Sequence, residues 1–308
     1  MRAVGAPPAH RRRGEKAESP VHVVSITSLK GGVGKTTVTL GLASAALHAG
    51  LRVLVIDLDP HADATTALAV RRGRCIDVGH LLRNARRQRL TDAVAASAWS
   101  REQRARVPGT TARLDVVPGS AYSGIFDRPD LGRRDLQRLH RLLTRDPEAA
   151  ASYDLALIDC PPSLNGLTRI AWTASSGVLL VAEPALFSVA GTERTLRALD
   201  LFRREYAPGL RTAGVVANRV RQDSPEQVFR LREMERMFTS LLLRPALVDR
   251  PVLAQIQGAA HAVHHWPGAD AGRAARDFDA ILAGLRGHTE GSGPAEFADA
   301  ATVPSVLV

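Results

Sequence analysis

Short apolar runs of strand length alternate along this chain with longer segments of helical periodicity. The strand-length runs are apolar at almost every position, which is typical of strands that helices cover on both faces. The alternation predicts an α/β fold with a mostly parallel, twisted sheet, helices on both faces and a single domain. The expected strands are residues 21–28, 52–59, 114–118, 154–160, 177–183, 212–218 and 241–247, and the expected helices are residues 35–49, 133–145, 164–174, 191–206, 225–240 and 271–285.

The two ends of the chain lack this periodicity. Residues 1–20 contain Pro7-Pro8 and an arginine run at 11–13, and they are predicted to form a disordered basic arm. Residues 287–308 begin with a segment rich in glycine and are predicted to form a flexible tail. The α/β domain is therefore expected to span residues 21–286. Within it, residues 71–113 are rich in arginine and alanine without a clear period, and no element is predicted there.

The charge of the chain favours a polyanionic partner such as nucleic acid. The sequence has 41 basic and 31 acidic residues, which give a formal net charge of +10. The only lysines are Lys16, Lys30 and Lys35, so nearly all of the positive charge comes from arginine. An arginine bias of this kind can also come from the nucleotide composition of a genome, so charge alone leaves DNA binding and a merely basic surface as equal alternatives.

Composition also bears on location. No apolar run is long enough to span a membrane, and the arginine-rich start lacks the apolar stretch of a signal peptide. Cys75 and Cys160 are too few for a disulfide framework or a cysteine-rich zinc site. We therefore expect a cytoplasmic protein without stable membrane association.

A phosphate-binding loop follows the first expected strand. The segment is Leu29-Lys30-Gly31-Gly32-Val33-Gly34-Lys35-Thr36-Thr37, and a helix follows at once. Glycines allow backbone N–H groups to converge on an anion, and the helix N-terminus adds its dipole. In this interpretation Lys35 neutralises the β and γ phosphates of a nucleotide, and the Thr36 hydroxyl binds Mg²⁺. The alternative is a glycine-rich turn that binds no nucleotide.

Carboxylates stand at the ends of two other expected strands. Asp57 and Asp59 end the strand at 52–59, and Asp159 ends the strand at 154–160. Ligands bind at the carboxyl ends of strands in such sheets, where a carboxylate can hold a water of the Mg²⁺ shell. For Asp57 the alternative is a helix N-cap or a turn residue.

The loop departs from the usual G-x-x-x-x-G-K-[ST] pattern, because Leu29 replaces the first glycine and Lys30 is an additional lysine. In these features the sequence resembles the ParA/MinD family of deviant Walker ATPases, whose loop is K-G-G-x-G-K-[ST]. The segment Asp159-Cys160-Pro161-Pro162-Ser163 is similar to the family's Walker B motif, D-x-P-P-S. The resemblance covers roughly residues 21–286.

The resemblance implies roles for individual residues. It implies that Lys30 reaches across a nucleotide-sandwich homodimer to the partner's phosphates, that Asp59 orients the attacking water and that Asp57 and Asp159 support Mg²⁺. It also implies that Asn218, at the end of a later strand, contacts adenine, which an amide can recognise by donating and accepting at once. Residues 61–63 depart from the family's usual Gln-Gly-Asn, a difference that bears on the rate of hydrolysis. The residues expected to bind ATP are Lys30, Gly31, Gly32, Val33, Gly34, Lys35, Thr36, Thr37 and Asn218.

The implied function is that of a ParA-like ATPase associated with the nucleoid. Such a protein binds Mg-ATP, dimerises and binds DNA non-specifically. It hydrolyses ATP slowly, a ParB-like partner triggers its release from DNA, and the cycle drives DNA partitioning. The alternatives are a MinD-like or other cargo-positioning switch that does not bind DNA, and a nucleotide-binding scaffold with little turnover. By regional similarity, the DNA-facing candidates are Arg203, Arg204, Arg219 and Arg221. These arginines could equally form a solvated face or pair with Glu205 and Asp223.

Overall fold

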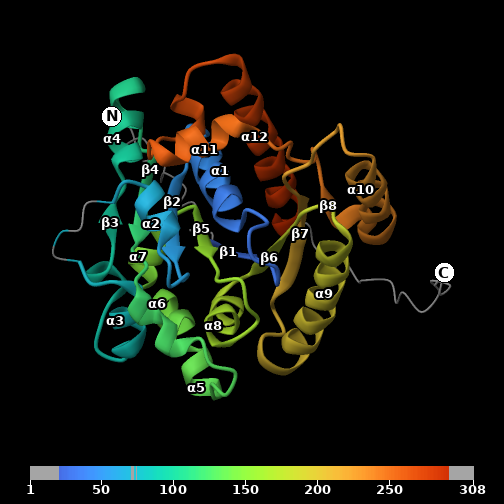
Figure 1. Cartoon of the computed structure of the whole chain (residues 1–308). Helices are drawn as coiled ribbons and strands as arrows, with labels where there is room; N and C mark the ends of the chain where they lie inside the picture. Colours follow the sequence, from blue (N-terminus) through green and yellow to red (C-terminus); the bar gives the residue numbers. More distant parts are fainter. Residues whose placement is uncertain (1–20, 71–72, 74, 291–308) are drawn as a thin grey trace, which may run out of the picture.

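The chain forms one eight-stranded sheet with helices on both faces (Figure 1). The computed structural model describes residues 21–70, 73 and 75–290. The strand order is β3-β4-β2-β5-β1-β6-β7-β8, and every neighbouring pair is parallel except β3 with β4. The expected α/β fold is therefore confirmed. The strands are β1 (His22–Thr27), β2 (Arg52–Asp57), β3 (Ala95–Ala96), β4 (Arg113–Val117), β5 (Leu155–Asp159), β6 (Gly177–Ala182), β7 (Arg211–Ala217) and β8 (Leu242–Leu243).

The sheet is buried on both faces because its strands carry apolar side chains at successive positions. Along β2, Val53 and Val55 join the apolar cluster on one face, while Leu54 and Ile56 join the cluster on the other. The first cluster includes residues of α1 (Lys35–His48) and α12 (Ala269–Glu290), and these two helices pack against each other. The second includes residues of α6 (Arg138–Arg145), α8 (Gly166–Ala174) and α9 (Leu186–Tyr206). The remaining α-helices are α2 (Asp63–Ala67), α3 (Val78–Arg83), α4 (Ala98–Arg106), α5 (Arg133–Leu136), α7 (Pro147–Ala151), α10 (Pro225–Phe238) and α11 (Pro251–Gly258).

Some element boundaries differ from those expected. The helix expected at 133–145 is divided into α5 and α6, and α9 begins at Leu186 instead of residue 191. The stretch without a period, 71–113, holds the short elements α3, β3 and α4. Each of these has too few turns or residues to produce a recognisable period, which is why the pattern predicted none. The helix α12 continues to Glu290, and residues 1–20 and 291–308 lie outside the described part of the chain.

The strand order places the phosphate loop and the acidic strand ends near the centre of the sheet. The strand β1 lies between β5 and β6, and β2 is the next strand beyond β5. The loops that follow β1, β2 and β5 therefore meet at one edge, where ligands bind in parallel sheets. None of the described helices has the length and apolar character needed to cross a membrane.

Candidate active site

The loop between β1 and α1 has the backbone of a phosphate cradle. Gly32 and Gly34 have positive φ values of 77° and 89°, a region that glycine enters without strain. Gly34 is the N-cap of α1 and supplies no side-chain cap, so the first N–H groups of the helix are not satisfied by a capping side chain. Lys35 is the first residue of α1 and is only 7 % exposed. This arrangement directs backbone donors and the helix dipole toward a bound anion.

Two residues that follow β7 form hydrogen bonds with the backbone of this loop. The buried Asn218 amide donates from Nδ2 to the carbonyl oxygen of Val33 at 2.8 Å. Arg219, which has a positive φ of 58°, donates from Nη1 to the carbonyl oxygen of Gly32, also at 2.8 Å. Asn218 therefore supports the loop, and its contact with adenine stays a prediction. Arg219, expected on a DNA-facing surface, has its guanidinium at the phosphate loop.

Asp159 is bound by two threonines of α1. Its Oδ2 accepts from Thr36 Oγ1 and its Oδ1 accepts from Thr39 Oγ1, each at 2.8 Å. The carboxylate is fully buried. The expected neighbours Thr36 and Asp159 are thus brought together. Thr39 was not predicted, although its position three residues after Thr36 on the same helical face was a usable signal.

Asp57 lies beside Asp159 because the two residues are Cα partners in the register of β2 with β5. Its Oδ2 accepts from the backbone N–H of Thr65 at 2.8 Å and from Thr65 Oγ1 at 2.6 Å. The N–H of Gly119 donates in turn to Thr65 Oγ1. A Cβ at Gly119 would lie 2.8 Å from Asp57 Cγ, so only glycine fits against this carboxylate. Sequence reasoning missed Gly119, whose signal was a Pro-Gly turn after β4.

The free oxygen of Asp57 marks a place for a cation. Within the described residues, the buried Oδ1 atom of Asp57 has no hydrogen-bond partner. Burial raises the pKa of Asp57, and the neighbouring carboxylate of Asp159 raises it further. Burial likewise raises the pKa of Asp159, against the opposing effects of Thr36, Thr39 and Lys35. Two buried carboxylates with an open oxygen, next to a threonine hydroxyl, fit the oxygen ligands and waters of Mg²⁺.

Asp59 and Lys30 occupy the more accessible rim of the site. Asp59 is partly exposed after β2, and its Oδ1 accepts from the N–H of His61 at 3.0 Å. The Lys30 ammonium is directed to Glu183 Oε2 at 3.4 Å, with 43 % of the lysine side chain exposed. Glu183, at the end of β6, was not predicted to lie here, and the sequence held no signal for the pair.

Among the described residues, none of the other DNA-facing candidates pairs with Glu205 or Asp223. Arg203 and Arg204 both pair with Asp200 on α9, each at 2.7 Å. Glu205 instead lies 4.0 Å from Arg133. The backbone N–H of Arg221 donates to Gln227, and the exposed Arg221 side chain makes no ion pair within the described residues.

Sequence comparisons agree with the geometry of the site. Residues 21–212 match the family described as an AAA domain. The chromosome partitioning protein ParA of Caulobacter vibrioides is 35 % identical over 205 residues, which cover 64 % of this chain and 69 % of ParA. Soj, the sporulation initiation inhibitor protein of Bacillus subtilis, is 31 % identical over 201 residues, which cover 63 % of this chain and 71 % of Soj.

Solved structures share the fold at lower identity. The structure of apo McdA from Cyanothece has a TM-score of 0.68 at 18 % identity and covers 87 % of this chain and 99 % of McdA. The cell division ATPase MinD of Pyrococcus furiosus has a TM-score of 0.61 at 23 % identity and covers 86 % of this chain and 98 % of MinD. Taken with the sequence relatives and the phosphate loop, these findings establish that the chain belongs to the ParA/MinD family of P-loop ATPases.

Proposed function

We propose that this protein binds Mg-ATP, dimerises around it, binds DNA non-specifically and hydrolyses ATP slowly to drive DNA partitioning. The observation that carries the proposal is the buried Asp57–Asp159 pair beside the phosphate loop, with one carboxylate oxygen left without a partner among the described residues. The name of the relative ParA of Caulobacter vibrioides, a chromosome partitioning protein, supports the partitioning role. A ParB-like protein is the proposed partner.

Lys35 and Thr36 bind the phosphates and the metal ion in this proposal. The bound Mg²⁺ would supply charge neutralisation for the β and γ phosphates. Asp159 orients the Thr36 hydroxyl, and Asp57 offers its free Oδ1 atom to the hydration shell. The backbone N–H groups of Gly31, Gly32, Val33, Gly34 and Thr37, together with Lys30 of a second copy, complete the proposed phosphate contacts.

The binding step is tested with Lys35→Ala and Lys30→Ala. Lys35→Ala removes the buried ammonium and should weaken Mg-ATP binding by at least about 100-fold, because a charged group contributes about 1.5–3 kcal/mol per hydrogen bond. Lys30→Ala removes an exposed ammonium that pairs with Glu183, and it should leave binding to the monomer within about threefold of the parent. Equilibrium titration measures both. Equal binding by Lys35→Ala and the parent would refute the phosphate-loop assignment.

The hydrolysis step is tested with Asp59→Ala. Asp59 is the carboxylate proposed to orient the attacking water, and it lies on the accessible side of the buried pair. The variant should bind ATP as the parent does and lose at least about 99 % of the turnover rate, because general-base or positioning groups contribute about 10²–10⁴-fold. Phosphate release in single-turnover conditions measures the effect. Parental turnover by this variant would transfer the role to another group, such as His61 or Asp63.

The DNA-binding step is tested by its dependence on ATP and salt. Binding to random-sequence duplex should require ATP, show no sequence preference and weaken steeply with salt, because each neutralised phosphate releases a counterion. Arg221→Gln should reduce the salt slope, since its side chain makes no ion pair within the described residues. Absence of binding by the ATP-loaded parent at low salt would favour a positioning switch that does not act on DNA.

A further inference from the structure

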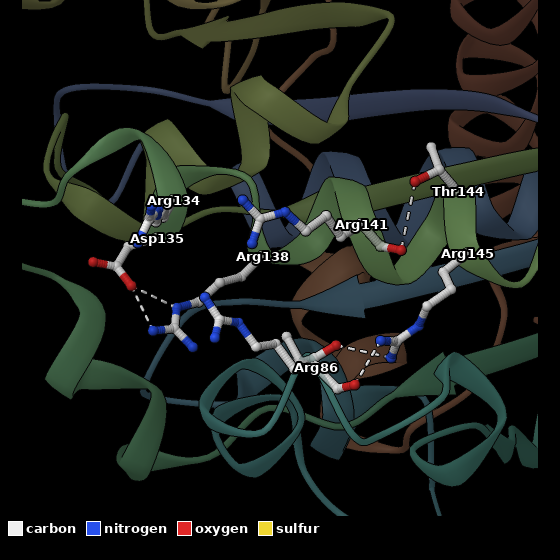
Figure 2. Close-up of a pocket in the computed structure, with 8 residues that line it drawn as sticks. Arg86, Arg134, Asp135, Arg138, Arg141, Thr144 and Arg145 are labelled. Carbon is white, nitrogen blue, oxygen red and sulfur yellow. Dashed lines mark hydrogen bonds and ion pairs between the residues drawn. The ribbon is translucent and has the colours of Figure 1, made fainter.

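A recess lies between α5, α6 and the segment that follows α3, and five of the eight residues that line it are arginines. It has a volume of about 350 Å³. Figure 2 shows the guanidinium groups of Arg86, Arg138 and Arg141 directed into the same space. None of the residues that line the recess belongs to the phosphate loop or to the strand ends around it. The lining residues are Ala85, Arg86, Arg134, Asp135, Arg138, Arg141, Thr144 and Arg145.

Two of these arginines form hydrogen bonds that connect the walls of the recess. Arg145 donates from Nη1 to the carbonyl oxygen of Arg86 at 2.7 Å and from Nη2 to that of Ala85 at 2.8 Å (Figure 2). Arg138 donates from Nη1 to the carbonyl oxygen of Leu82 at 2.9 Å and from Nε to Asp135 Oδ1 at 2.8 Å. The Leu82 carbonyl lies in the last turn of α3, where helix carbonyls lack intrahelical partners, and Ala85 and Arg86 follow the end of that helix. Arg138 and Arg145 therefore hold α6 against the segment at the end of α3.

The other three arginines have guanidinium N–H groups without an acceptor among the described residues. Arg86 and Arg134 are exposed, and neither side chain makes an ion pair or hydrogen bond within the part of the chain that is described. Among the described residues, the Arg141 side chain donates to a single acceptor, Gln137 Oε1, at 2.8 Å. Asp135, the one acidic lining residue, is already paired with Arg138. The recess thus has five arginines against one aspartate in its lining, so most of its positive charge is not neutralised by its own wall.

We propose that this recess is a second phosphate-binding site, separate from the phosphate loop. Guanidinium groups match phosphate oxygens in a bidentate geometry, and several of them around one concavity favour a group of multiple negative charges. Arg138 and Arg145 are held in place before any ligand arrives, which lowers the entropic cost of binding. The phosphates come from the nucleic-acid backbone or from a small polyphosphate. Thr144 also lines the recess, and its hydroxyl donates to the carbonyl oxygen of His140 at 2.9 Å.

The test compares two double variants in a Lys35→Ala background, so that the phosphate loop does not contribute. Arg86→Gln with Arg134→Gln removes two recess arginines that support nothing else. Arg101→Gln with Arg104→Gln, on α4, removes the same charge from exposed arginines elsewhere. The probes are inorganic tripolyphosphate, followed by calorimetry, and a random-sequence DNA duplex, followed by anisotropy. Thermal unfolding verifies that both variants are folded.

The recess variant should bind tripolyphosphate at least about tenfold more weakly than the control variant, since each charge-assisted bond contributes more than a neutral one. A parallel loss of duplex binding identifies the nucleic-acid backbone as the source of the phosphates. Loss with tripolyphosphate alone identifies a small polyphosphate. Equal binding of both probes by the two variants would overturn the proposal. Because the comparison is made without Lys35, its outcome is independent of whether the protein is an ATPase.

Discussion

At the scale of single residues, the site depends on contacts that leave no room for additional atoms. The amide of Asn218 lies directly under the phosphate loop, bonded to the carbonyl of Val33. A Cβ built at Gly34 would lie 2.3 Å from Asn218 Nδ2, well inside van der Waals contact. The shape of the loop therefore depends on glycine at position 34 both for its φ value and for the space beneath it.

Gly34→Ala tests this contact against a matched control. Gly32 also has a positive φ, but a Cβ there would meet no atom within 4 Å. Gly32→Ala should lower the free energy of unfolding by about 1 kcal/mol from backbone strain alone. Gly34→Ala should lower it by about 1–3 kcal/mol more, because it adds overpacking against Asn218. Denaturant unfolding measures the difference, and equal losses in the two variants would contradict the close approach.

At the scale of elements, the pairing of β2 with β5 creates the proposed metal site. The register places Asp57 opposite Asp159, and the helix α1 supplies both threonines that bind Asp159. Two carboxylates buried side by side are costly unless a cation or a proton compensates them. The carboxylates of Asp57 and Asp159 therefore repel each other, and a bound Mg²⁺ would relieve this repulsion.

Asp57→Asn should stabilise the protein in Mg²⁺-free buffer. Burial and Asp159 raise the pKa of Asp57 from 3.8 to about 7, so the unfolded state loses this proton first as pH rises. The parent therefore loses stability between about pH 4 and pH 7 through this group, and the asparagine variant does not. The variant should exceed the parent by about 1–3 kcal/mol at pH 8 and by less at pH 5. Asp63→Asn, an exposed aspartate on α2, is the control and should change little. A constant difference across this pH range would contradict the account.

Thr39→Val should weaken Mg²⁺-dependent nucleotide binding. The substitution keeps the shape of the side chain and removes the 2.8 Å bond to Asp159 Oδ1, so the carboxylate loses one of its two orienting donors. The expected loss of stability is about 1–3 kcal/mol, the cost of leaving a buried acceptor unsatisfied. Thr173→Val is the control, because Thr173 Oγ1 donates only to the carbonyl of Arg169 in its own helix. Unfolding and Mg²⁺ titrations measure both effects, and equal behaviour of the two variants would contradict this role.

At the scale of the whole molecule, the proposed ATP-dependent dimer depends on Lys30. Its ammonium pairs with Glu183 of the same chain across 3.4 Å and is largely accessible. An exposed pair of this kind contributes about 0–1 kcal/mol, so a second copy with bound phosphates can compete for the lysine. Lys30→Ala should therefore abolish the ATP-dependent dimer, while Glu183→Gln, which frees the lysine, should preserve or strengthen it. Light scattering after size exclusion with ATP measures the dimer, and an undiminished dimer in Lys30→Ala would exclude the trans contact.

The sequence by itself determined the layered fold and the parts of the site that are local. Apolar runs with polar groups at their ends predicted strands β1, β2 and β5, and the segment 30–37 predicted the phosphate loop at the start of α1. Glycine φ preferences and strand periodicity act over a few neighbouring residues, so they can be read along the chain.

Only the tertiary structure decided which groups face one another. Asp57 and Asp159, Asn218 and Val33, and Arg86 and Arg141 are brought together from distant parts of the chain by strand order and helix packing. Neither strand order nor register is contained in local periodicity, because the same alternating pattern is compatible with several orders of strands. For this reason the sequence predicted the acids but not Thr39, Thr65 and Gly119, which hold them, and it contained no sign of the arginine recess.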